Sequence, residues 1–155
     1  MFRVEAANLA QYLAFDPARA VELEKLHHAM RVAAPRLKRY FHKGTPAGAA
    51  GMRMKMIGYG AFRYVAGNGE QVEWPTIGVA LQKNYISVYI PLTLDRKPLV
   101  ARHARTLNAL RSADYNFSFE RFDDLNPRAA DKLFSDAARI IKTDPDNPVR
   151  CMQRQ

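Results

Sequence analysis

The sequence predicts an α+β domain in which an antiparallel sheet of about four to five strands packs with N-terminal, middle and C-terminal helices. Two observations predict it. Apolar residues recur at helical spacing near both ends of the chain. Between them, segments rich in β-branched and aromatic residues alternate with turn residues, as antiparallel strands do. At 155 residues the chain is long enough to bury one core of its own.

The first strong helix signal follows Asp16-Pro17. An aspartate can cap the free amides of a helix start, and proline suits the first turn. Pro35 should end this helix, and a shorter one is expected over residues 4–13. The apolar stripe of the helix that starts at Asp16-Pro17 is Ala20, Leu23, His27, Met30 and Ala34.

Residues 42–51 are rich in Gly, Pro and Ala, and we expect a flexible loop there. No Gly-Lys-Ser/Thr sequence follows, so the loop does not match a phosphate loop. Three antiparallel strands are then expected over roughly 61–66, 75–82 and 85–91. Reversals at Gly67-Asn68-Gly69 and at Lys83-Asn84 should separate them.

The last third of the chain predicts two helices around one strand. Leu99, His103, Leu107 and Leu110 share helical spacing, and Phe117 to Phe122 is a fourth strand candidate. Asn126-Pro127 should start a helix that runs to about Ile141. We expect one domain over residues 1–142 and a frayed tail over 143–155, because the tail holds two prolines and little to bury.

The segment QKNYISVYI has two unlike faces. In a tight hairpin about Lys83-Asn84, Gln82 lies opposite Tyr85, Ala80 opposite Ser87, and Gly78 opposite Tyr89. The apolar face should receive the helices; it consists of Ile77, Val79, Leu81, Ile86, Val88 and Ile90. The other face sets small residues beside tyrosines. It is either the floor of a ligand groove or ordinary cross-strand packing beneath a second layer.

A basic, aromatic-walled ligand site follows from the groove interpretation. Lysines beside tyrosine rings suit a small anion or a planar ligand, although a lysine in a turn is also an ordinary hydrophilic residue. The candidate ligand-binding residues are Lys55, Tyr59, Tyr64, Lys83, Tyr85, Ser87 and Tyr89.

The charge balance is basic, with 24 Lys and Arg against 15 Asp and Glu. A net charge of +9 favours anionic partners, or simply keeps the surface self-repelling. We expect weak nucleic-acid binding as one alternative function, although no helix-turn-helix or RNP-like motif supports it. The candidate anion surface is Arg96, Lys97, Arg102, Arg105 and Arg111.

Several chemistries find no pattern in this sequence. No apolar run approaches the roughly 20 residues of a membrane span. His27 and His28 diverge on a helix, and Met52, Met54 and Met56 fit gap-filling core better than a soft-metal box. Cys151 lies near the end without a neighbouring base. We therefore predict no catalytic residues, no metal ligands, no cofactor and no membrane partner. A single cysteine makes the cytoplasm the expected compartment.

Three segments together resemble the DUF1801, or YdhG-like, domain family. They are MIGYGAFRY, GNGEQVEWPTIGVALQKNYISVYI and FSFERFDDLN, within roughly Met54 to Ile141. The resemblance implies a compact bacterial α+β domain with an antiparallel sheet, and implies little about function. One lineage of the family is described as a frataxin-like iron chaperone that uses acidic surface, whereas the acids of this chain are scattered.

The sequence thus predicts a module that binds a small-molecule or protein partner through the groove, and it favours a binding function over an enzymatic one. An intracellular iron chaperone is the alternative that the resemblance implies, and nucleic-acid binding is the third.

Overall fold

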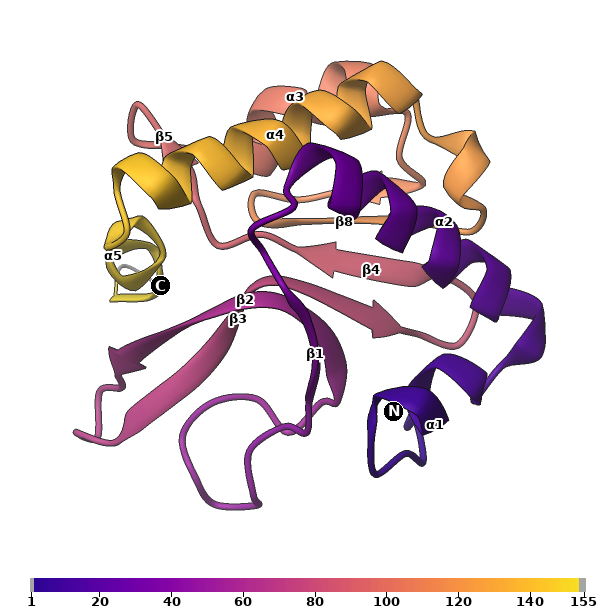
Figure 1. Ribbon diagram of the computed structural model, residues 1–155. Coiled ribbons are helices and arrows are strands. Elements are labelled where there is room, and N and C mark those ends of the chain that lie inside the picture. The colour runs from indigo at the N-terminus through magenta and orange to yellow at the C-terminus, as the bar shows by residue number, and fades with distance from the viewer. Residues whose placement is uncertain (1, 154–155) are drawn as a thin grey trace.

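The fold comes from a computed structural model that describes residues 2–153. Helices cover one face of a curved antiparallel sheet, and the other face carries no helical layer apart from a short helix at one end (Figure 1). The α+β class is confirmed, and the sheet is larger than expected, with six strands in the order β1-β2-β3-β4-β8-β7. The strands are β1 Arg39–His42, β2 Met56–Val65, β3 Gln71–Leu81, β4 Ile86–Tyr89, β7 Arg111–Ser112 and β8 Asn116–Phe119. A separate two-stranded hairpin pairs β5 Thr93–Leu94 with β6 Lys97–Pro98.

The two predicted helix starts are confirmed. The Asp16 side chain accepts a hydrogen bond from the Ala18 amide, and the Asn126 side chain accepts from Arg128 and Ala129. Each cap is followed by proline in the first helical turn. The helices are α1 Leu9–Ala14, α2 Pro17–Ala33, α3 Leu99–Leu107, α4 Pro127–Thr143 and α5 Asn147–Gln153, with a short 3₁₀ turn, η1, over Phe122–Asp124.

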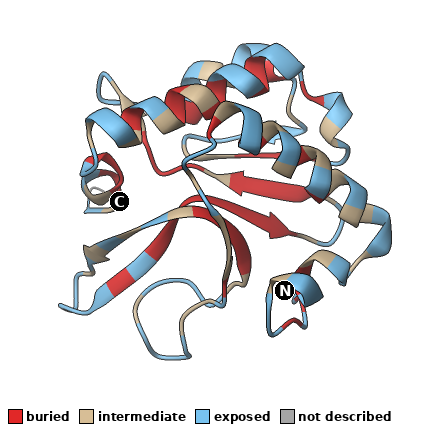
Figure 2. Cartoon of the chain, viewed as in Figure 1, coloured by how far each residue is buried: buried red, intermediate tan, exposed pale blue. Residues whose placement is uncertain are grey.

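The main core lies between the sheet and α2, α3 and α4. All six apolar residues predicted to face the helices are buried, between 0% and 3% exposed, and belong to this core. Figure 2 shows the buried colour running along the central strands and along the sides of α3 and α4. Leu23, Leu133 and Phe134 close the core from the helical side.

Two predicted elements, the first helix and the C-terminal tail, need correction. The first helix begins at Leu9 and not at residue 4, because Asn8 caps it and Gln11 Oε1 accepts from the Ala7 amide, which fixes the start. The tail is not frayed up to Gln153, since α5 folds there with Pro148 and Cys151 buried. Residues 154–155 of the predicted tail lie outside the described residues.

The predicted flexible loop is a connection without regular secondary structure between β1 and β2. Its expected first residue, His42, is instead the last residue of β1 and is buried. Within residues 2–153 no helix has the length and apolar character needed to cross a bilayer.

Candidate functional site

The tyrosine-bearing face of the sheet is the face that the main helices leave uncovered, and we call it the open face. The predicted register is confirmed: Gly78 pairs with Tyr89 and Ala80 with Ser87. The Gln82 amide donates to the Tyr85 carbonyl at 2.9 Å, which closes the hairpin as expected. Tyr85 and Tyr89 are both half-buried, so no second helical layer covers them.

The floor beside Gly78 is nonetheless filled by the protein itself. A Cβ on Gly78 would lie 3.0 Å from Met56 Sδ, and Ala80 is fully buried with Met56, Val72 and Trp74. The expected hollow next to the small residues therefore does not exist. Its volume is taken by Met56, whose side chain shares the open face because β2 and β3 pair in register.

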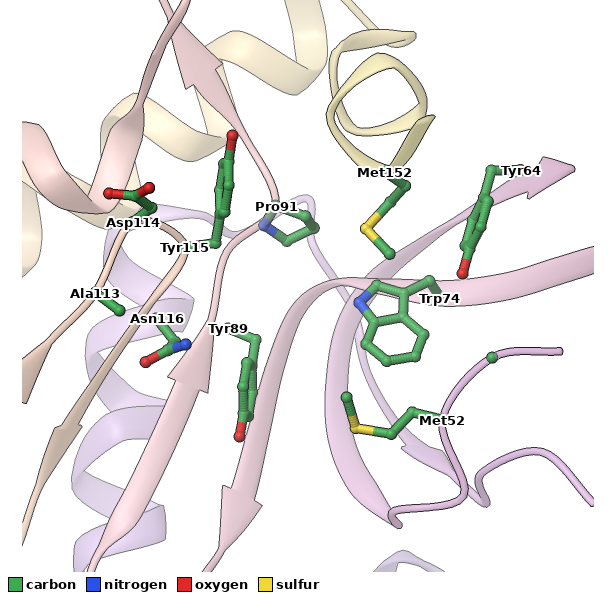
Figure 3. Close-up of a pocket in the computed structure, with 11 residues that line it drawn as sticks. Met52, Tyr64, Trp74, Tyr89, Pro91, Ala113, Asp114, Tyr115, Asn116 and Met152 are labelled. Carbon is green, nitrogen blue, oxygen red and sulfur yellow. The ribbon is translucent and has the colours of Figure 1, made fainter. Parts of the chain in front are cut away.

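A pocket of about 620 Å³ lies farther along the open face, beyond Tyr89 (Figure 3). It forms where the β2-β3 ribbon, the end of β4, the β7-β8 turn, the β1-β2 loop and α5 meet. Its lining residues are Gly51, Met52, Tyr64, Trp74, Tyr89, Pro91, Ala113, Asp114, Tyr115, Asn116 and Met152. We call this the aromatic pocket, because four of its eleven lining residues are tyrosine or tryptophan.

The β2-β3 ribbon supplies Tyr64 and Trp74. In the paired register Phe62 lies opposite Trp74 and Tyr64 opposite Val72, so these alternate residues share the open face. Gly69, with a φ of 85°, turns the ribbon back on itself. The edge of His42 packs against the Trp74 ring with centroids 5.8 Å apart, and only 6% of Trp74 is exposed. The indole is thus held in one orientation at the pocket wall.

The C-terminal helix α5 supplies Met152. The side chain of Asn147 accepts from the Thr93 amide and donates to the Thr93 carbonyl, each at 2.9 Å. These two hydrogen bonds to Thr93 of β5 fix the start of α5. Cys151, in the same helix, is buried. Met152 then faces the Trp74 ring from above in the view of Figure 3.

The β7-β8 turn supplies the polar side of the pocket. The Ala113 amide donates to the Asn116 carbonyl at 2.8 Å, and the Ile90 amide donates to the Tyr115 carbonyl at 2.7 Å. These bonds attach the turn to the end of β4. They place the Asn116 amide beside Tyr89, whereas the Asp114 side chain lies beyond Tyr115 at the outer side of the pocket (Figure 3).

Buried neutral groups surround the ribbon end of the pocket. Burial raises the pKa of Tyr40 to about 12 and raises the pKa of Tyr64, while burial lowers the pKa of His42. All three are therefore uncharged at pH 7. Within residues 2–153 the Tyr40 hydroxyl and His42 Nε2 are buried without a hydrogen-bond partner. The His42 ring that packs against Trp74 accordingly carries no formal charge at pH 7.

The structure separates the predicted ligand residues. Tyr64 and Tyr89 line the aromatic pocket. Tyr59 does not, because it lies with Ile57 in the core on the helical side of β2: it is 1% exposed, and its hydroxyl lies 2.9 Å from His27 Nδ1. Lys55 is also elsewhere, since its ammonium donates to the Ala6 carbonyl at 2.7 Å.

The other end of β4 holds the remaining predicted residues. Lys83 is exposed in the β3-β4 turn. The Tyr85 ring lies beneath the Arg111 guanidinium, 5.7 Å from it, and Ser87 is buried opposite Ser118. No lysine lines the aromatic pocket, so this pocket lacks the basic character that was expected of the predicted site.

The predicted anion surface is divided by the sheet. Arg102 and Arg105 are exposed on α3, and Arg96 and Lys97 lie in the hairpin that precedes this helix. Arg111 instead covers Tyr85 on the open face. Over the described range, 2–153, no three His, Cys, Asp or Glu side chains gather as a metal site requires.

Sequence reasoning missed most of the pocket. Trp74 shares its parity on β3 with Gly78 and Ala80, so strand alternation alone assigns it to the open face. Nothing in the sequence brings Asp114, Tyr115 or Met152 to Trp74, because these contacts join distant segments. Comparison with protein-family models, with curated proteins and with solved structures gives no match for this chain.

Proposed function

We propose that this domain binds a small molecule in the aromatic pocket and acts as a binding module. One observation carries the proposal: a pocket of about 620 Å³ lies on the one sheet face that the main helices leave open, and aromatic rings line it. Small-molecule sites have volumes of roughly 300–1,000 Å³ and are mostly apolar with a few polar groups. Asp114 and Asn116 are the polar groups here.

The arrangement of the walls favours a ligand with a flat or compact apolar body. Tyr89 stands apart from Trp74, and Met152 and Met52 lie above and below the Trp74 ring in the view of Figure 3. Aromatic faces and thioethers contact such a body well, because both are polarisable and bury large apolar area. No nucleophile with an adjacent base lines the pocket, so binding without chemistry is the simplest function for it.

The proposal is tested by a ligand-observed NMR screen of soluble aromatic and aliphatic fragments. Fragments are expected to bind with dissociation constants of about 0.1–5 mM, as small ligands of modest contact area do. Tyr89→Ala should abolish this binding, while Tyr85→Ala should retain it. Tyr85 is a matched control on the same face of the same hairpin, but it lies outside the pocket. Fragments that bind both variants equally, or no binding at all, would refute the proposal.

Nucleic-acid binding is the second candidate, favoured by the exposed Arg102 and Arg105 on α3. This binding should fall steeply with salt, because it rests on phosphate contacts. A gel-shift series with single-stranded oligonucleotides from about 50 mM salt upward tests it. Oligonucleotide binding that is unchanged in the double variant Arg102→Ala/Arg105→Ala would remove this candidate.

The resemblance to the YdhG-like family enters here as a proposal of kinship. It rests on the three sequence segments quoted above, and the proposed cytoplasmic location rests on the single cysteine. The iron-chaperone alternative gains no ligand set from residues 2–153.

A further inference from the structure

The charge of the aromatic pocket differs in sign from the charge of the protein. The chain carries a net charge of +9, yet none of the pocket's eleven lining residues is Lys, Arg or His, and one is an aspartate. Two arginines near the pocket in sequence are directed elsewhere: Arg111 covers Tyr85, and Arg150 pairs with Asp144. Among the lining residues that the structure describes, Asp114 therefore supplies the one formal charge.

The lining also suits one kind of ligand charge. The face of an aromatic ring carries negative potential and attracts a cation within about 6 Å of its centroid. Four aromatic residues, Tyr64, Trp74, Tyr89 and Tyr115, line the pocket, and Met52 and Met152 add polarisable apolar contacts. An anion would meet the Asp114 carboxylate and no cationic partner in the lining. A primary ammonium has three N–H donors that need acceptors, whereas a quaternary ammonium, such as a trimethylammonium head, has none.

We propose that the aromatic pocket selects a small organic cation of the quaternary-ammonium class, held against the rings of Tyr89 and Trp74, with Asp114 of the lining as its counter-charge. This inference rests on the proposed function, because it names the ligand class of the same pocket. The pocket is several times larger than a trimethylammonium head, so the natural ligand carries a further apolar or polar body.

The experiment uses choline and its neutral carbon isostere, 3,3-dimethyl-1-butanol (dimethylbutanol below), as probes on the full chain. Trp74 is the only tryptophan of the protein, so its fluorescence reports occupancy of this pocket directly. Choline should change the fluorescence saturably and bind about tenfold more tightly than the isostere, which has the same shape without the charge. Equal affinities, or tighter binding of the isostere, would overturn the inference while leaving the proposed function in place.

A charge variant gives a second readout. Asp114 is exposed, so Asp114→Asn is expected to fold normally. It should weaken choline binding about threefold and leave dimethylbutanol binding unchanged, because only the cation is attracted by the carboxylate. Asp131→Asn is the matched control, since Asp131 is an exposed aspartate on α4, outside the pocket. If both substitutions weaken choline binding equally, the net charge of the protein, and not a charge in the pocket, sets the affinity for choline, which would contradict the role of Asp114.

The two proposals fail in distinguishable ways. A fluorescence response to neither choline nor its isostere would overturn the cation inference. The proposed function would then be decided by the fragment screen with Tyr89→Ala and Tyr85→Ala, which needs no cationic ligand. Fragments that bind through Tyr89 would keep a neutral-ligand pocket, and their absence would remove both proposals.

Discussion

Tyr12 is the clearest single test of how the fold is held together. Its hydroxyl accepts a hydrogen bond from the Leu81 amide at 2.8 Å and donates to the Lys55 carbonyl at 3.3 Å. The side chain is fully buried, and it joins α1 to the ends of β2 and β3. Tyr12→Phe keeps the ring against Phe41, whose centroid lies 6.0 Å away, and removes only the oxygen.

The cost of this substitution follows from the two backbone groups that lose their partner. A buried amide or carbonyl left without a hydrogen bond costs about 1–3 kcal/mol. We therefore expect the free energy of unfolding to fall by about 2 kcal/mol at pH 7. For a domain of this length, that corresponds to a fall in melting temperature of about 4–8 °C.

The same residue predicts an alkaline limit of stability. Burial raises the pKa of Tyr12 to about 12, opposed by its hydrogen bond from Leu81 and the charge of Arg19. Below pH 10 the phenol is protonated in both states, so its contribution is fully present there. Between pH 10 and 12 the unfolded chain ionises and the folded chain does not, so stability falls as the pH rises. In Tyr12→Phe this part of the fall should be missing.

Urea unfolding at pH 7 and at several values from pH 9 to 12 measures both effects. Tyr85→Phe is the control, because Tyr85 is half-exposed, and it should change the stability by less than about 0.5 kcal/mol. A Tyr12→Phe variant as stable as the wild type at pH 7 would show that these two hydrogen bonds contribute nothing. An unchanged alkaline slope would show that Tyr12 is not a source of it.

Three further predictions concern the open face and its surroundings. Gly58→Ala should cost about 1–3 kcal/mol, because a Cβ there would lie 2.3 Å from the Tyr40 ring and would overpack it. The free energy of unfolding should fall as the pH drops from about 7 towards 5, because burial lowers the pKa of His42 and only the unfolded chain takes up the proton in this range. In His42→Asn this fall should be smaller. Asn147→Ala should release α5 and raise the rate at which a thiol reagent labels the buried Cys151 by at least about tenfold, because about 1–3 kcal/mol of hydrogen bonding to β5 is lost.

Matched measurements make these three predictions refutable. Gly67→Ala is the control for Gly58→Ala, since no atom lies within 4 Å of a Cβ at that position. Equal stabilities of the two glycine variants would contradict the overpacking. Burial also lowers the pKa of His27, so part of the fall in stability between pH 7 and 5 should remain in His42→Asn. A fall as large in this variant as in the wild type would contradict the pH prediction. A labelling rate of Cys151 equal to that of the wild type would show that Asn147 does not hold α5.

The sequence specified the parts of the fold that depend on local rules. Strand alternation and the Lys83-Asn84 reversal were enough for the register of β3 and β4, and capping residues located α2 and α4. The strand β1 was missed because its four residues lie in a run of basic side chains that reads as a charged surface. The helix α5 carries an Asn147-Pro148 start like the two that were recognised, so its signal was present and was outweighed by its short length.

The site was predicted less well, for a physical reason. Local alternation placed Tyr64 and Tyr89 on the open face, and the same parity excludes Tyr59 from it. The hollow beside Gly78 was an expectation about volume, and volume depends on which side chain from another strand fills it, here Met56. A pocket assembled from five separate segments depends on tertiary contacts that no local pattern contains.

The most direct test of the central claim is a measurement of contacts between bound choline and the protein by nuclear Overhauser spectroscopy at saturating choline. We expect cross-peaks from the choline methyl protons to ring protons of Trp74 and Tyr89. Cross-peaks to the apolar surface of α2 around Val21, or none to either ring, would contradict it.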